Sequence, residues 1–226
     1  MHLPRSTRSI AGWLLITVGL VLIGYVLWQF YGTNVVAHQR QDRLRSQIEQ
    51  QWRDGADPEV TVGGGLSGGG PRHSVHADAL IRIPRFGDDY VVPVLEGTDD
   101  AVLAAGFGHF TDTAAAGAVG NYALAAHRVT HGEPLRGMPD LQRGDEVIVE
   151  TRTTTYTYVL DTGGSEVTVP FTAGWVLDPV PHNPDGGVEP SQKAGQRLIT
   201  LTTCSELFHT DDRLIAFGHL VSRTAK

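Results

Sequence analysis

The sequence is poor in cysteine and in positive charge. It contains a single cysteine, Cys204, which excludes a disulfide within the chain and a zinc site built from several cysteines. Its 18 Lys and Arg are outnumbered by 25 Asp and Glu, which gives a net charge of −7. Nucleic-acid binding needs a basic surface, so no nucleic-acid partner is expected. A lone cysteine is either a buried small residue or a reactive thiol.

Charged side chains are absent from residues 9–39. Within this segment Ile10–Tyr31 is almost entirely apolar, and about 20 such residues suffice to cross a bilayer as a helix. Trp13 and Trp28 lie near its two ends, as aromatic rings do at membrane interfaces. The run exceeds the roughly 7–15 residues typical of a cleaved signal peptide, and no A-x-A-like site follows it. We therefore expect an uncleaved transmembrane helix at 10–31, preceded by a short segment at 1–9. Positive charge flanks the helix on both sides and does not decide its orientation.

Residues 32–78 have the composition of a stalk followed by a linker. Val36–Trp52 is polar and free of Gly and Pro, which is compatible with a short helix, and we interpret it as a solvated stalk. Asp54–His73 contains two glycine triplets, a composition typical of flexible linkers. A Gly-rich loop that binds phosphate would follow a strand and precede a helix, and neither is indicated here.

Alternation of apolar and polar residues begins at Ala79, where we place the start of a folded domain, 79–226. Helical periodicity is scarce, and short helical turns are expected only near Asp100–Gly106 and Leu135–Leu141. Many short segments rich in Val, Ile, Thr and Tyr, separated by turn signals, predict a mainly β fold, either a closed barrel or a sandwich. The predicted strands are Ala79–Phe86, Tyr90–Leu95, Asn121–Ala126, Glu146–Glu150, Thr154–Leu160, Glu166–Val169, Arg197–Thr203 and Arg213–Leu220.

Cys204 directly follows the predicted strand Arg197–Thr203. A residue at the end of a strand is held by a rigid scaffold and remains accessible, as catalytic residues are. Because only the thiolate attacks, a reactive cysteine needs a base or a positive charge nearby. Arg213 lies nine residues beyond Cys204, a spacing that suits a strand–loop–strand return placing the two side by side. A guanidinium there could hold a substrate carbonyl or stabilise an oxyanion.

A histidine would complete such a site, but the residues alone do not select one. His127 is a candidate because it follows the predicted strand Asn121–Ala126 and precedes a polar loop. Four histidines precede the predicted domain: His2, His38, His73 and His76. The other candidates in or near the domain are His109, His131, His182, His209 and His219.

These residues form a pattern that resembles the sortase family. Thr200–Cys204 matches the TLxTC motif of that family in full, and Arg213 stands where its catalytic arginine is expected. Asn121–Arg128 looks like the strand that carries the catalytic histidine of the family. The resemblance covers roughly Ala79–Val221 and is closest to class E sortases of actinobacteria.

The resemblance implies an eight-stranded sortase barrel with short helices, and a cysteine transpeptidase that needs no cofactor and no metal. It implies cleavage of an LAxTG- or LPxTG-like C-terminal sorting signal between Thr and Gly. The partners would be surface proteins bearing that signal and an amine of lipid II or peptidoglycan. The resemblance also implies a single-pass anchor with 1–9 in the cytoplasm and the catalytic domain outside the cell. The site residues so implied are His127, Cys204 and Arg213 for catalysis, and Leu201, Thr202 and Thr203 for substrate contact.

Some positions depart from the family pattern without removing a catalytic group. Ala126 replaces a Gly often found before the histidine, Ser205–Glu206 replaces a His-Pro pair, and Phe110 stands where Tyr is common. Two other functions stay open: a catalytically silent, membrane-tethered domain that binds peptides or wall polymers, and a hydrolytic thiol peptidase. A pilin-polymerising sortase usually carries a second span and a lid, and neither is recognisable, which favours protein anchoring.

Overall fold

The computed structural model describes residues 5–27, 33–64, 70–204 and 211–226. The helices of this part of the chain are α1 (Arg5–Leu27), α2 (Thr33–Arg53) and α3 (Asp100–Leu103), with 3-10 turns η2 (Pro84–Phe86), η3 (Met138–Asp140) and η4 (Gly174–Leu177). The strands are β1 (Glu59–Val62), β2 (His73–Arg82), β3 (Val92–Glu96), β4 (Phe107–His109), β5 (Gly120–Ala125), β6 (Glu146–Glu150), β7 (Thr154–Leu160), β8 (Val167–Pro170), β9 (Arg197–Cys204) and β10 (Asp212–Ala225).

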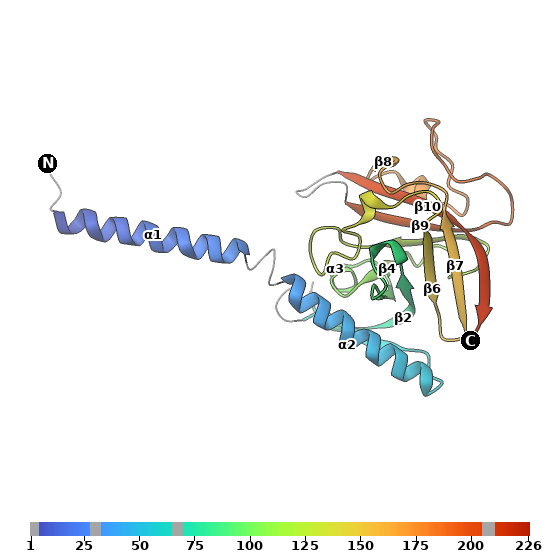
Figure 1. The fold of residues 1–226 in the computed structure, drawn as a ribbon, viewed down its shortest axis with the longest axis horizontal. Coiled ribbons are helices and arrows are strands. Elements are labelled where there is room, and N and C mark those ends of the chain that lie inside the picture. The colour runs from blue at the N-terminus through green and yellow to red at the C-terminus, as the bar shows by residue number, and fades with distance from the viewer. Residues whose placement is uncertain (1–4, 28–32, 65–69, 205–210) are drawn as a thin grey trace.

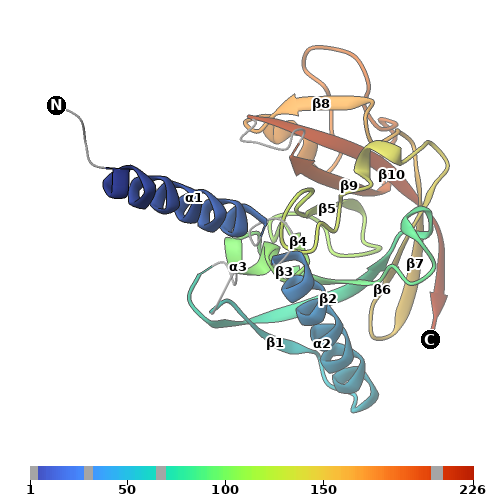
Figure 2. The ribbon, with the colours of Figure 1, turned by 60° about the vertical axis from the view of Figure 1, so that its left-hand side comes forward.

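Eight of these strands close into a barrel. They pair in the order β2-β3-β4-β5-β9-β10-β7-β6, and the pairing of β6 with β2 completes the ring. Strand β1 lies outside the ring on β2, and β8 lies outside it on β10 (Figures 1 and 2). The ring is closed and leaves no open edge between its strands. The prediction of a mainly β fold is therefore confirmed, and of the two architectures considered the fold is the closed barrel.

The interior of the barrel is filled by alternate residues of its strands. In β6, Val147 and Val149 are fully buried while their neighbours are not, as the period of two requires. Tyr122, Tyr158 and Phe107 are among the largest side chains in this core. Burial of an apolar side chain such as Phe107 stabilises the fold by about 1.5–3 kcal/mol.

The folded part begins earlier than the alternation at Ala79 indicated. Strand β2 starts at His73, and the segment expected to be a flexible linker contains β1, whose Val60 and Val62 are buried. The predicted strand at 79–86 is also too long, because Pro84 begins a 3-10 turn.

The segment interpreted as a solvated stalk is helix α2, and that interpretation is wrong. Leu44 and Ile48 are buried in a hydrophobic cluster with β1, β2, β3 and α3. Figures 1 and 2 show α2 lying alongside β1 and β2. The polar sequence concealed this packing because the apolar face of α2 is only one narrow stripe.

The predicted anchor at 10–31 extends beyond the described residues, since 28–32 are not described. Its described portion falls in α1, where Trp13 and Leu15 are among the exposed apolar side chains. Within the part of the chain that the structure describes, no helix meets the length and apolarity needed to cross a membrane.

Candidate active site

Three strand ends meet at one edge of the barrel. Cys204 is the last residue of β9, and its register partner in antiparallel β10 is Arg213. Strand β5 runs parallel to β9, so both strands end at the same edge, where Ala125 pairs with Thr202. His127 lies two residues past the end of β5. The side-by-side placement expected from the spacing of Cys204 and Arg213 is confirmed, and residues 205–210 between them lie outside the described residues.

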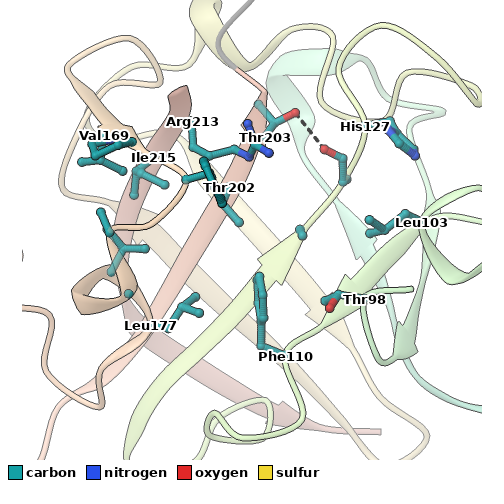
Figure 3. A pocket seen from close by; sticks show the side chains of 17 residues that line it. Thr98, Leu103, Phe110, His127, Val169, Leu177, Thr202, Thr203, Arg213 and Ile215 are labelled. Carbon is teal, nitrogen blue, oxygen red and sulfur yellow. Dashed lines mark hydrogen bonds between the residues drawn. The ribbon is translucent and has the colours of Figure 1, made fainter. Parts of the chain in front are cut away.

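A pocket of about 370 Å³ opens at this edge, with His127 and Arg213 in its wall. Figure 3 shows these two side chains on either side of Thr203. Most of the other side chains in the wall are apolar, which suits an extended peptide with small and aliphatic residues. Besides His127 and Arg213, the wall includes Thr98, Leu103, Phe110, Val169, Phe171, Val176, Leu177, Thr202 and Ile215.

The part of the pocket wall that η4 forms is held in place by buried polar groups of β5 and β9. Thr200 Oγ1 donates to Asn121 Oδ1 at 2.8 Å, and Asn121 Nδ2 donates to the Val176 carbonyl of η4 at 2.9 Å. Both polar side chains are almost fully buried, so each hydrogen bond avoids the cost of an unsatisfied polar group. The first threonine of the TLxTC motif therefore holds η4 over the sheet.

The three residues predicted to contact the substrate have different surroundings. Thr202 and Thr203 line the pocket, and Thr203 Oγ1 donates to the carbonyl of Ala126 at 2.7 Å. This bond ties the end of β9 to the residue before His127 (Figure 3). Leu201 is fully buried in the barrel core and is not part of the pocket wall. Alternation along β9 turns Leu201 inward, so packing replaces its predicted substrate contact.

His127 is held as a neutral imidazole. Burial and the neighbouring His131 lower its pKa from 6.5 to about 4, while Asp100 acts in the opposite direction. The rings of His127 and His131 are stacked, with centroids 4.8 Å apart. A neutral imidazole near a pocket can accept a proton, as a general base must.

Arg213 supplies the positive charge of the site. Its side chain is partly buried, and its Nη1 donates to the carbonyl of Asp212 at 3.0 Å. A planar guanidinium presents several N–H groups in a fixed fork, which suits a carbonyl oxygen that gains negative charge. The structure thus describes the side chains of His127 and Arg213 and the backbone of Cys204.

Two other described histidines of the domain have acidic partners, and His131 does not line the pocket. His182 pairs with Glu189 at 2.9 Å, and His219 pairs with Asp161 at 2.8 Å. His209 and His2 lie outside the described residues. Among the described histidines, His127 is the one that lines the pocket, which selects it among the candidates that the sequence left open.

One group of side chains has the donor types of a metal site. Asp78, Glu96 and His109 bring their polar atoms within 4.8 Å of one another. His109 Nδ1 lies 3.1 Å from Glu96 Oε1, and its Nε2 lies 3.1 Å from the carbonyl of Ala114, which can only accept. Both ring nitrogens of His109 thus face acceptors, so the protonated ring forms an ion pair with Glu96.

Sequence reasoning missed the loop residues of the pocket wall. Thr98 and Leu103 come from the segment around α3, and Val169 and Phe171 come from the end of β8. Their contribution depends on how distant loops fold over the sheet, which no local pattern indicates. Phe110 had drawn attention only as a departure from a family pattern.

Comparison with known proteins adds to this geometry. The family model described as "Sortase domain" matches residues 81–221, which is more than half of the chain. The chain belongs to the sortase family. This is a family of cysteine transpeptidases, and its matched region contains His127, Cys204 and Arg213.

Among curated relatives, sortase SrtE1 of Streptomyces coelicolor is 34% identical over 223 residues, which cover 96% of this chain. Sortase SrtE2 of the same organism is 29% identical over 233 residues and covers 100% of this chain. The chain spans 57% of the length of SrtE1 and 86% of the length of SrtE2.

Among solved structures, sortase E of Streptomyces avermitilis is 41% identical, with a TM-score of 0.56 over 66% of this chain and 90% of that chain. Sortase E1 of S. coelicolor, solved with a tripeptide in its active site, is 33% identical over the same shares, also with a TM-score of 0.56. The resemblance to class E sortases is confirmed.

Proposed function

We propose that the protein cleaves an LAxTG- or LPxTG-like sorting signal between Thr and Gly and transfers the new acyl end to an amine. The observation that carries this proposal is the meeting of three strand ends. Cys204 is the register partner of Arg213, and His127 lies at the same edge in the wall of the same pocket. These are the nucleophile, oxyanion support and base that acyl transfer requires.

In the first step Cys204 attacks the carbonyl carbon of the threonine. The neutral imidazole of His127 takes the thiol proton as the C–S bond forms. Arg213 stabilises the negative charge that develops on the carbonyl oxygen. The imidazolium then gives its proton to the glycine nitrogen, the C–N bond breaks, and a thioester remains on Cys204.

In the second step an amine attacks the thioester carbonyl. His127 takes a proton from the attacking nitrogen, and the same proton returns to the sulfur as the C–S bond breaks. The products are a new peptide bond and a free thiol, so the enzyme is regenerated. The acceptor we propose is an amine of lipid II or peptidoglycan.

The shape and chemistry of the pocket support this class of substrate. Val169, Leu177 and Ile215 offer aliphatic contacts to the first residues of a sorting signal, and Thr202 and Thr203 lie at the end nearest Cys204. The tripeptide in the active site of S. coelicolor sortase E1 supports a peptide as the ligand.

We also propose that the domain acts outside the cell on surface proteins and is anchored by the N-terminal segment. The support is the apolar run at 10–31, which carries no Asp, Glu, Lys or Arg. Fractionation of cells that express the full chain, followed by protease treatment of intact spheroplasts, tests this part. A chain recovered with the soluble fraction, or protected from external protease, would contradict it.

The test of the reaction uses the purified full chain in detergent with an LAxTG-containing peptide and a short oligoglycine. The expected products, read by mass spectrometry, are the ligated peptide and a thioacyl adduct on Cys204, both absent from Cys204→Ala. Cleavage without ligation under saturating amine would indicate a hydrolase. Absence of cleavage together with resistance of Cys204 to alkylation would indicate a silent binding domain.

A further inference from the structure

The loop that follows His127 has an unusual backbone. His131 has φ 55°, Gly132 has φ 80° and Glu133 has φ 50°, so three consecutive residues lie in the left-handed region. Non-glycine residues keep this conformation only where their surroundings hold them, and such residues gather at functional sites. The loop is closed by the Leu135 N–H, which donates to the carbonyl of His127 at 3.0 Å.

Helix α2 holds this loop in place. Gln41 Nε2 donates to the carbonyl of His131 at 3.4 Å across 90 residues of sequence, and the Gln41 side chain is only 5% exposed. A Cβ atom at Gly132 would lie 2.9 Å from Gln41 Nε2 and 3.2 Å from the Cβ of Ala37. The helix therefore packs directly on the turn, with no space for a side chain between them.

The turn presents the ring of His131 to the ring of His127. The two rings stack at 4.8 Å between centroids, with 29° between their planes. His131 is not part of the pocket wall, so a peptide in the pocket would meet His127 and not His131. The contact between the two rings is thus suited to orienting His127 from behind.

We infer that His131 is a positioning residue for His127 and that Gln41 of α2 holds it in that role. The inference rests on the proposed function, in which His127 moves the proton between sulfur and nitrogen. Proton transfer requires the imidazole within hydrogen-bond reach of both atoms, and small misplacements of a catalytic group slow a reaction strongly. The helix that follows the N-terminal segment is thereby part of the catalytic apparatus.

Burial and the nearby positive charge both disfavour protonation of the two rings, while Asp100 opposes them. Burial lowers the pKa of His131, and the positive charge of Arg40 on α2 lowers it further. Asp100 on α3 raises the pKa of both histidines, and Arg213 faces the same pocket as His127. Two stacked imidazoles beside the positive charge of Arg40 do not both hold an extra proton, which favours the neutral form of His127.

The experiment uses the full chain with labelled histidine and follows the titration of the His127 ring by NMR. His131→Asn keeps a residue that tolerates the left-handed backbone but removes the ring. Gln41→Met keeps the length of the side chain but removes the donor. In both variants we expect the pKa of His127 to move from about 4 toward 6.5. Gln47→Met, an exposed position on the same helix, is the matched control and should leave the titration unchanged.

Ligation kinetics provide a second measurement. We expect kcat to fall about tenfold in His131→Asn and Gln41→Met, with KM for the peptide within about twofold of wild type, because neither residue lines the pocket. A His127 titration identical in wild type and both folded variants would overturn the inference. A wild-type chain that ligates nothing would instead contradict the proposed function, and the NMR comparison would still decide whether α2 positions His127.

Discussion

Two neighbouring strands are each associated with a histidine near their last residue, and the two histidines have opposite surroundings. His109 closes β4 and is enclosed by Glu96, Asp78 and a backbone carbonyl, while His127 follows β5 and faces an open pocket beside another histidine. Burial lowers the pKa of His109, but the hydrogen bond to Glu96 and the charges of Asp78 and Glu96 raise it overall. The pKa of His127 is lowered to about 4.

The difference separates a histidine that holds the fold from one that is available for chemistry. All hydrogen-bonding capacity of His109 is used within the protein, so the ring contributes to stability and has no proton to exchange with a substrate. His127 is partly buried, and its pKa is lowered although Asp100 acts in the opposite direction; such a perturbed pKa is common among catalytic groups. Substitution of His109 should therefore change stability, and substitution of His127 should change the rate of the reaction.

The largest effect is expected at His127. His127→Gln removes the group that moves the proton, and general acid–base catalysis contributes about 10²–10⁴-fold. We expect ligation to fall by about 10³-fold while the midpoint of thermal unfolding stays the same or rises, because a buried ionisable group is removed. The measurement pairs peptide ligation with a thermal melt. Loss of stability as well as activity in His127→Gln would contradict the assignment of His127 to catalysis alone.

Arg213 should show the next largest effect. Arg213→Lys keeps the positive charge but loses the planar fork, so we expect kcat to fall by about 10–10²-fold with little change in stability. Arg82→Lys is the matched control, since Arg82 pairs with Glu150 on the barrel surface and does not line the pocket. Equal activity of the two variants would show that Arg213 does not support the oxyanion.

Features that depend on neighbouring residues could be predicted from the sequence, and features that depend on distant segments could not. Barrel strands such as Glu146–Glu150 and Thr154–Leu160 were predicted with their observed bounds, because side-chain alternation is local. The pairing of Cys204 with Arg213 was also predicted, because the two residues are only nine positions apart in the sequence. Selection of His127 required a family resemblance, since the pocket wall that distinguishes it from the other histidines is built from distant segments.

Helix α2 could not be predicted as part of the domain. Its apolar positions are few, and Gln41 is as polar as its solvated neighbours. What makes Gln41 a buried residue is the carbonyl of His131, 90 residues away, and long-range hydrogen bonds leave no mark in a local pattern. The short strand β4 was missed because three residues are too few to establish a period.

His109→Leu should lower the free energy of unfolding and leave the ligation rate unchanged. The change leaves Glu96 and the Ala114 carbonyl without their donor, and an unsatisfied partly buried group costs about 1–3 kcal/mol. Chemical denaturation measures the free energy of unfolding. His182→Leu is the matched control, because His182 pairs with Glu189 in an exposed position and should change stability by only about 0.5 kcal/mol. A tenfold loss of kcat in folded His109→Leu would contradict the assignment.

The smallest effect, and the sharpest comparison, is the dependence of stability on pH. The folded-state pKa of His109 lies above 6.5, so its stabilising contribution is fully present below pH 6.5 and is lost as pH rises through the folded-state pKa. Asp78, whose pKa burial raises above 3.8, acts in the same direction, whereas Glu96, whose pKa its bond to His109 lowers below 4.5, loses its contribution toward acid.

For His127 the sign is reversed. Its folded-state pKa of about 4 lies below 6.5, so the unfolded chain binds more protons and the folded state is penalised as pH falls from 6.5 toward 4. Relative to wild type, His127→Gln should therefore gain stability toward acid, whereas the stability lost in His109→Leu should shrink above pH 6.5. Urea denaturation of the three proteins at intervals from pH 4.5 to pH 8.5 measures both differences. Slopes of the same sign for the two variants would mean that the two histidines are not electrostatic opposites, and the assignment of one to the fold and the other to catalysis would lose its physical basis.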